Sequence, residues 1–170
     1  MAKKYIRNNN GVLTETEATT ASSGAVNAGD IIALDATGHI DETLLPSGIG
    51  ADVVSIEASE DLSAGDMVDV YDLSGTPYVR KADATTAGKK AVGFVLDSCT
   101  SGSDAAVYFE GQNNQLSGLT AGQTLFLSAT TPGGVTATAP SGSGNIVQVV
   151  GRAISATSMA FEPAQPIVLA

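Results

Sequence analysis

The chain has 170 residues, of which 19 are Gly, six are Pro and none is Trp. Its formal net charge of −10 argues against a nucleic-acid-binding body, because phosphate contacts need clustered Lys and Arg side chains. A single Cys99 excludes an internal disulfide, so the fold must rest on its own core or on partner subunits.

Signals for secretion or membrane insertion are not visible in the sequence. The first ten residues include basic side chains, but no apolar run follows them as a signal peptide would require. The longest apolar stretches, such as residues 146–150, have the length of a strand and are too short for a bilayer. We therefore expect a soluble protein, made in a cytoplasm, with neither a membrane nor a nucleic acid as its partner.

The charges are unevenly spread along the chain. Lys3, Lys4 and Arg7 are followed by no Lys or Arg until Arg80, and 13 carboxylates lie between. From Arg80 onward five basic and five acidic side chains cancel. The basic tip either binds an acidic or nucleic-acid surface, or only solubilises a tail.

Residues 1–30 are predicted to form an extended arm. Large side chains are scarce after the tip, and a Thr/Ala/Ser/Gly tract runs through Gly24. Alone, such a segment cannot bury enough apolar area to offset the entropy cost of ordering it. We expect it to become ordered by lying on another surface, with these docking residues: Lys3, Lys4, Tyr5, Ile6, Arg7, Val12 and Leu13.

Residues 31–51 are predicted to form a short collar. A strand over 30–34 would lead into a turn with Gly38 at positive φ. Asp41 is placed to cap one helical turn over 42–45, which Pro46 would stop. Ile40, Leu44 and Leu45 lack apolar partners nearby, so they would either pack around a threefold axis or cover one end of the chain's own barrel.

Residues 52–170 contain an imperfect internal repeat. The stretch 62–71 returns at 119–128, 57 residues later, with an Ala-Gly turn before apolar side chains at every second position. A second match pairs Gly93 with Gly151 at an offset of 58. Strands every 10–12 residues or so, separated by Gly/Pro turns, predict an all-β fold. We expect a small antiparallel barrel or sandwich made of two repeats, in which residues 111–116 only link the halves.

Catalytic and metal-binding patterns are not recognisable in the sequence. His39 has no Ser or Cys motif near it, and Cys99 belongs to no CxxC or His pattern. Asp66, Asp69 and Asp72 lack the spacing of a calcium loop and are interpreted as a solvated acidic rim. The glycine runs near 133 and 142 precede neither a Lys nor a helix, so they are hairpin turns. We expect a protein that is not an enzyme and has neither a cofactor nor a metal.

Two segments resemble virion proteins of tailed bacteriophages. The stretch 34–46, with the pattern Leu-Asp-x-x-Gly-x-Ile-Asp-x-x-Leu-Leu-Pro, resembles a collar element of trimeric phage fibres. Residues 118–135 and 149–163 resemble the β-domain of capsid decoration (cement) and head-fibre proteins. The resemblance implies a homotrimer on the outer surface of the virion head, bound to the major capsid protein and cementing neighbouring capsid subunits through its arm.

The alternative function is that of an adhesin, on a tail fibre or a head fibre, that binds host-surface glycan. The same pattern occurs in virion proteins mounted on the tail, where the β-domain would bind host-surface glycan. Such sites usually use exposed aromatic side chains, and Tyr and Phe together number only eight here. The composition therefore favours the head over the fibre.

Overall fold

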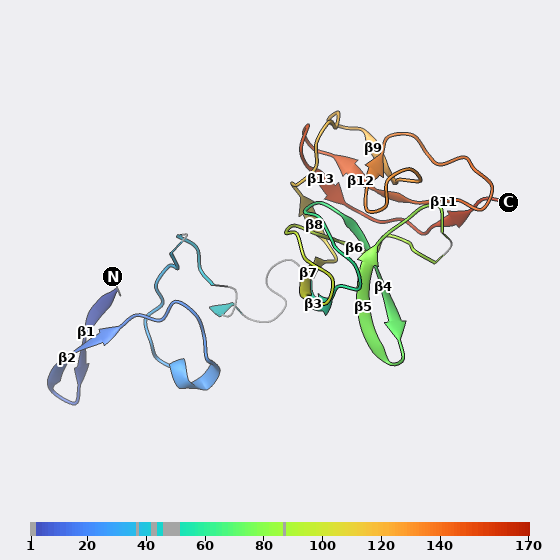
Figure 1. Cartoon of the computed structure of the whole chain (residues 1–170). Helices are drawn as coiled ribbons and strands as arrows, with labels where there is room; N and C mark the ends of the chain where they lie inside the picture. Colours follow the sequence, from blue (N-terminus) through green and yellow to red (C-terminus); the bar gives the residue numbers. More distant parts are fainter. Residues whose placement is uncertain (1–2, 37, 42–43, 46–51, 87) are drawn as a thin grey trace. The chain divides into compact units, whose positions relative to one another are not determined.

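A computed structural model describes residues 3–36, 38–41, 44–45, 52–86 and 88–170. The chain divides into two compact units, Met1–Gly50 and Ala51–Ala170, called here the N-terminal unit and the β unit (Figure 1). Within the described residues, no helix has the length and apolar character needed to span a bilayer.

The N-terminal unit begins with a two-stranded antiparallel hairpin. Its strands are β1 (Lys4–Asn9) and β2 (Val12–Glu17). Asn10 and Gly11 form the two-residue turn, with φ values of 51° and 91°, the backbone that suits a tight hairpin. The arm thus folds back on itself, which the sequence argument did not predict. A 3₁₀ helix, η1 (Gly24–Asn27), follows.

The predicted collar has little regular structure. The strand expected over 30–34 is wrong, since only Ile32 pairs there, in a parallel bridge with Thr19. The expected turn is present: Asp35 N–H donates to His39 O over 2.8 Å, and Gly38 has φ +86°. Leu44 N–H donates to Asp41 O over 3.0 Å. The rest of the predicted helical turn, with Glu42, Thr43 and Pro46, lies outside the described residues.

The β unit is all-β, as predicted, and contains two five-stranded antiparallel sheets. The strands of the first sheet are β3 (Val53–Glu57), β4 (Met67–Leu73), β5 (Thr76–Lys81), β6 (Gly93–Val95) and β7 (Asp104–Tyr108). The strands of the second sheet are β8 (Gly111–Asn113), β9 (Thr124–Leu127), β10 (Val135–Thr136), β12 (Val149–Ala153) and β13 (Met159–Phe161). Strands β11 (Ile146–Val147) and β14 (Ile167–Val168) form a separate pair.

The two sheets share one topology. The first runs β3-β7-β6-β4-β5 and the second, read from its other edge, β8-β13-β12-β9-β10. Each strand therefore occupies the place of its counterpart in the other half, which makes β8 the equivalent of β3. The segment predicted as a mere link supplies this edge strand, and the extra pair β11–β14 has no counterpart in the first sheet.

Equivalent hydrogen bonds hold the two repeated turns. Gly65 N–H donates to Val95 O, and Gly122 N–H donates to Ala153 O, both over 2.8 Å. The paired glycines of β6 and β12 also play one role, because each lies directly against the neighbouring strand. A Cβ on Gly93 would lie 2.7 Å from Tyr108 O, and one on Gly151 would clash with Ala160 O. The sequence repeat is therefore a structural repeat.

Two apolar clusters stabilise the β unit. One lies within the first sheet and includes Val68, Val79, Val95 and Val107. The other joins the halves, since Met67 and Phe94 of the first sheet pack with side chains of the second, such as Leu125. The sheets pack together without either closing into a barrel, so the sandwich alternative holds. One isolated parallel bridge, Ala58 to Val79, connects the chain after β3 with β5.

Candidate functional site: an exposed hairpin and a charged strand face

The N-terminal hairpin has two different faces. The register places Lys4, Ile6 and Asn8 on one face with Glu17, Glu15 and Leu13 across from them. Ile6 is 65% exposed and Leu13 is 72% exposed, so this face offers two aliphatic side chains to an external surface. The Lys4–Glu15 ion pair, at 3.2 Å, is also exposed and contributes at most about 1 kcal/mol.

The opposite face of the hairpin is directed at its own unit. A Cβ on Gly29 would lie 3.9 Å from an Arg7 guanidinium nitrogen, and the Tyr5 hydroxyl is buried with no hydrogen-bond partner among the described residues. Asp30 accepts hydrogen bonds from Thr19 and Asn27, over 3.0 and 3.1 Å. The bond from Asn27, then that from Thr19, lowers the pKa of Asp30. Polar contacts therefore fix this loop.

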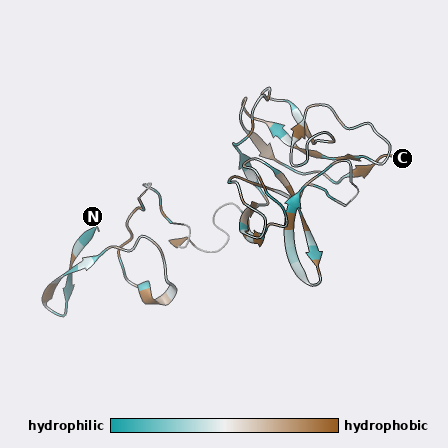
Figure 2. Cartoon of the chain, viewed as in Figure 1, coloured by the Kyte–Doolittle hydropathy of each residue, from teal (hydrophilic) through white to brown (hydrophobic). Residues whose placement is uncertain are grey.

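None of the described residues of the N-terminal unit is buried. Figure 2 shows hydrophobic residues along its backbone, and nine large apolar residues of the unit are exposed: Ile6, Val12, Leu13, Val26, Ile31, Ile32, Leu34, Ile40 and Leu45. Burial of one such side chain contributes about 1.5–3 kcal/mol. The unit thus has a defined backbone and an apolar surface that its own described residues leave uncovered.

The predicted site residues all belong to this unit. The docking residues Lys3, Lys4, Tyr5, Ile6, Arg7, Val12 and Leu13 lie on or beside the hairpin, but on both of its faces. Of the predicted trimer contacts, Ile40 and Leu45 are exposed at 51% and 39%, and Leu44 is half-buried. Capsid docking and trimer contact remain predictions for all of them.

The prediction of a solvated acidic rim at Asp66, Asp69 and Asp72 is wrong for Asp69. Asp69 is buried, and its Oδ2 accepts a hydrogen bond from Arg80 Nε over 2.8 Å. Asp72 instead caps the β4–β5 turn by accepting from Gly75 N–H. Burial raises the pKa of Asp69, against the hydrogen bond and charge of Arg80 and the charges of Lys90 and Lys89.

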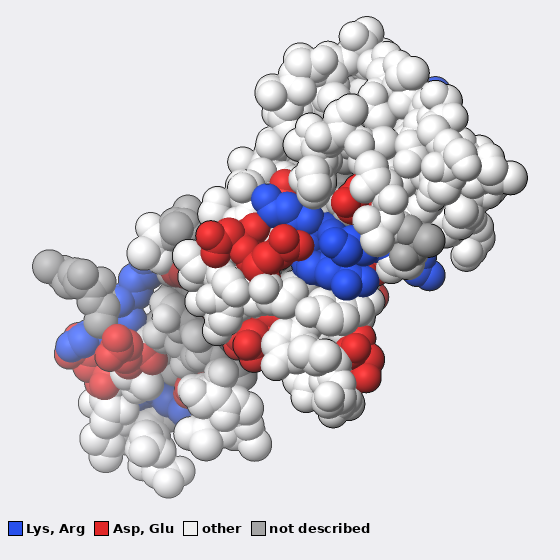
Figure 3. Space-filling model, turned by 45° about the vertical axis from the view of Figure 1, so that its right-hand side comes forward, with Lys and Arg blue, Asp and Glu red and all other residues white. Residues whose placement is uncertain are grey.

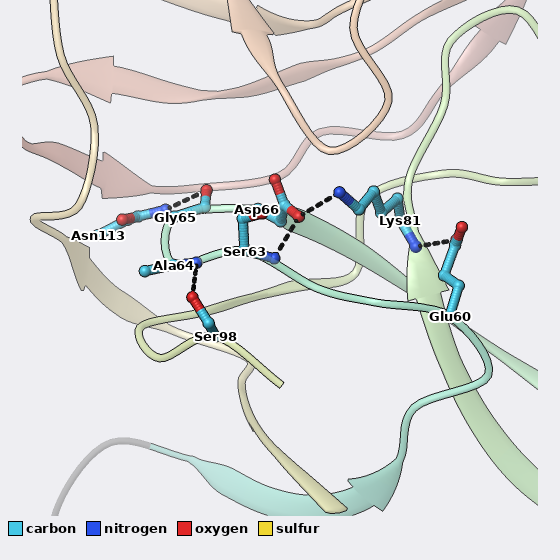
Figure 4. A network of polar contacts seen from close by, with 8 residues as sticks. All are labelled: Glu60, Ser63, Ala64, Gly65, Asp66, Lys81, Ser98 and Asn113. Carbon is cyan, nitrogen blue, oxygen red and sulfur yellow. Dashed lines mark hydrogen bonds and ion pairs between the residues drawn. The ribbon is translucent and has the colours of Figure 1, made fainter. Parts of the chain in front are cut away.

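A polar network fixes the first of the two repeated turns (Figure 4). Asp66 Oδ2 accepts from Ser63 N–H over 2.8 Å and lies 3.0 Å from Lys81 Nζ. Lys81 N–H donates to Glu60 Oε1, also over 2.8 Å. The buried Asn113, on β8, donates to Gly65 O over 2.9 Å and so ties the second half to this turn. This network has a structural role, because its carboxylates and its buried amide are already paired.

The face of β4 and β5 that carries Tyr71, called here the Tyr71 face, extends from the interface between the sheets into solvent. The register pairs Asp69 with Arg80, Tyr71 with Tyr78 and Leu73 with Thr76 on this face. The Arg80 guanidinium lies 4.1 Å from the Tyr71 ring centroid, and the two tyrosine rings are 6.2 Å apart. Figure 1 shows the β4–β5 hairpin extending beyond the rest of the unit.

Cations gather beside this face. Four of the five basic residues of the β unit lie between 80 and 90, and Figure 3 shows Lys and Arg side chains grouped next to carboxylates. Arg80 and Lys81 form ion pairs with Asp69 and Asp66. Lys89 and Lys90 form none with the described residues. Lys90 also lines a groove of about 230 Å³ that contains Pro163 and Pro166.

Other chemically suggestive residues form no recognisable centre. The Cys99 thiol donates to Ser103 O and Thr100 O, over 3.4 and 3.5 Å, beside a groove of about 400 Å³ that Asp97 and Asp104 also line. Among the described residues, no group of three or more His, Cys, Asp or Glu side chains is placed to hold a metal ion. His39 is part of the turn at Asp35.

The Tyr71 face is the feature that sequence reasoning missed. The signal was present, because Tyr71 follows Met67 and Asp69 at every second position, and Tyr78 and Arg80 alternate in the same way after the Ser74-Gly75 turn. The number of aromatic residues in the whole chain did not indicate that Tyr71 and Tyr78 lie side by side.

No protein-family model matches the chain, and no curated protein matches it.

Proposed function

We propose that the protein is a structural component of a phage virion, which binds the outer surface of the head as a homotrimer. In this role the N-terminal unit lies on major capsid subunits and links neighbours, while the β unit remains outside. The protein performs no chemistry, and its effect is to add contact area to the shell.

One observation supports the proposal above the others: the described residues of 1–50 include an ordered hairpin yet no buried side chain. A folded-back hairpin loses less conformational entropy on docking than a disordered tail would, so more of the burial energy becomes affinity. Ile6 and Leu13 together would contribute about 3–6 kcal/mol on burial, before the costs of association. Linking three such weak contacts in one trimer multiplies their strength through effective concentration.

The charge layout is consistent with this role. Residues 15–72 carry 13 carboxylates and no basic side chain, while the tip carries Lys3, Lys4 and Arg7. An acidic body keeps densely coated particles apart, and a basic tip is attracted to acidic capsid surface. In the proposed trimer, Ile40, Leu44 and Leu45 pack around the threefold axis.

The test uses the full-length chain and heads of the encoding phage that lack the protein. We expect Ile6→Asp combined with Leu13→Asp to abolish cosedimentation with heads, because both charges would be buried against the shell. Val26→Asp is the matched control, since Val26 is 85% exposed in the same unit but lies on η1. Deleting residues 1–30 should also abolish binding while the β unit stays folded.

The same samples test the assembly. Light scattering of the wild-type chain should give three times the mass of one chain. Binding that survives both the double variant and the deletion would refute docking through the arm, and a monomer in solution would refute the trimer. Cryo-electron microscopy of virions should show many copies on the head, whereas a few copies at the tail would support the adhesin instead.

A further inference from the structure

The Tyr71 face combines apolar rings with fixed polar groups. Along β4 the exposure rises outward: Met67 and Asp69 are buried, Tyr71 is half-buried and Leu73 is 54% exposed. Tyr78 stands across from Tyr71 and is also half-buried. The Tyr71 face is therefore buried at its Met67 end and accessible to a ligand at its Leu73 end.

Arg80 and Asp69 fix the side chains of the Tyr71 face. Arg80 is positioned twice, by its 2.8 Å hydrogen bond to Asp69 and by its stacking 4.1 Å from the Tyr71 ring centroid. A guanidinium over a tyrosine ring is an attractive arrangement, because the cation faces the negative side of the ring quadrupole. The Tyr71 ring is thus fixed before any ligand arrives, and its neighbour Tyr78 completes a pre-formed aromatic surface.

Lys89 and Lys90, in the loop after β5, form no ion pair with the described residues. Asp83 N–H donates to Lys89 O and Val92 N–H donates to Val68 O, each over 2.9 Å, so the loop with Lys89 and Lys90 lies beside the inner end of β4 and β5. In a chain of net charge −10, this pair of adjacent lysines is a local exception. Lys90 also borders the groove of about 230 Å³ that Pro163 and Pro166 line, so a concave surface lies beside this lysine.

We infer that the Tyr71 face, together with Lys89 and Lys90, is a binding site for an acidic glycan. The apolar C–H faces of a sugar ring can lie on the tyrosine rings, whose hydroxyls also offer hydrogen bonds. The carboxylate of the sugar pairs with the lysines. This site goes beyond the proposed role on the head and does not depend on it, because it lies wholly in the β unit.

Charge and geometry favour a sugar over other anions. A nucleic acid would need a longer cationic track than two free lysines, and the acidic body would repel it. An acidic peptide would satisfy the lysines but would gain little from the pair of half-exposed rings. An acidic sugar uses both features of the surface at once.

The experiment is a titration of the full-length protein at low ionic strength, followed by amide NMR shifts and calorimetry. The acidic probes are hyaluronan oligosaccharides and polysialic acid, which differ in their sugar but share the carboxylate. Dextran serves as the neutral glycan, and poly-glutamate serves as the charge without the sugar. We expect at least one acidic glycan to bind and to shift amides of β4 and β5, with no binding of dextran and weaker binding of poly-glutamate.

Variants then separate the contribution of the lysines from that of the tyrosine rings. Lys89→Ala with Lys90→Ala, and separately Tyr78→Ala, should each weaken the Kd of the acidic glycan by roughly tenfold, a difference of about 1.4 kcal/mol. Tyr78→Phe keeps the ring and should bind within about threefold of wild type. Arg152→Ala is the cation control, because Arg152 is exposed on β12 of the other sheet, and it should bind like wild type.

The inference is overturned if neither acidic glycan binds, or if dextran binds as tightly as they do. Equal affinity for poly-glutamate, unaffected by Tyr78→Ala, would make the surface a docking site for acidic protein segments instead. Circular dichroism of each variant shows whether a lost interaction reflects unfolding. Failure of this site leaves capsid binding untouched, because that property is measured on heads through the N-terminal hairpin.

Discussion

Asp69 is a buried carboxylate whose ionisation reflects two opposed effects. Burial raises the pKa above 3.8, while the hydrogen bond and the charge of Arg80 act in the lowering direction. Replacing Arg80 by Met removes that partner and keeps an unbranched side chain in its place. We therefore expect the pKa of Asp69, followed by carboxyl NMR, to be above 3.8 in wild type and higher still in Arg80→Met.

The same shift predicts how stability depends on pH. A carboxyl whose pKa is raised on folding binds its proton more tightly in the native state than in the unfolded chain. Its stabilising contribution is complete below the unfolded pKa and is lost as the pH rises through the folded pKa. The free energy of unfolding of wild type, minus that of Asp69→Asn, should thus fall from pH 3 upward and then level off. A difference that rises with pH would contradict a raised pKa.

Among the elements, hairpin β1–β2 depends most on its turn. Gly11 has φ +91° with open space around it, so an added Cβ would meet no atom within 4 Å and would act only through backbone strain. Strain of this kind costs about 1–2 kcal/mol, which is large for an isolated two-stranded hairpin. We expect Gly11→Ala to remove amide-exchange protection across the Lys4–Glu17 to Asn9–Val12 ladder.

The neighbouring turn residue provides the control for that prediction. Asn10 has φ 51°, a conformation that Gly adopts easily, so Asn10→Gly should keep the hairpin. Retained protection in Gly11→Ala would mean that contacts with the rest of the N-terminal unit, and not the turn, hold the strands together. Loss of protection in both variants would point to the Asn10 side chain.

Element-level prediction from the sequence was uneven for physical reasons. The long strand β4 was predicted because Val68 and Val70 recur at every second position, although Met67 and Asp69 on its other face are buried as well. The short strand β8 was missed, since three residues are too few to show a period and its pairing with β13 is long-range. The hairpin was missed although Asn10-Gly11 is a strong turn signal, because an argument from apolar content gave it no core to fold on.

At the scale of the whole molecule, the duplication was visible in the sequence but the packing of its halves was not. A repeat predicts equivalent positions, and Gly93 and Gly151 are equivalent, because each lies against a carbonyl oxygen of the neighbouring strand. The halves are joined by residues that differ between the two repeats. Met67 and Phe94 are buried between the sheets, whereas Thr124 and Arg152, at the equivalent positions of the second repeat, are half-buried and exposed, respectively. The candidate glycan site lies on the same face of β4 as Met67, farther toward the tip of the β4–β5 hairpin.

This asymmetry predicts opposite outcomes at equivalent positions. Phe94→Ala should lower the free energy of unfolding by about 3–5 kcal/mol, because Phe94 is 1% exposed, stacks on Tyr108 and meets Phe161 edge to face, with ring centroids 5.4 Å apart in both pairs. Arg152→Ala, the same position in the second repeat, should change it by less than about 0.5 kcal/mol. Urea denaturation measures both. Since the cluster draws side chains from both sheets, wild type should unfold in one transition, and Phe94→Ala should also weaken the coupling between halves. Similar costs at the two positions, or two separate transitions in wild type, would mean that the repeats fold independently and that the shared cluster does not unite them.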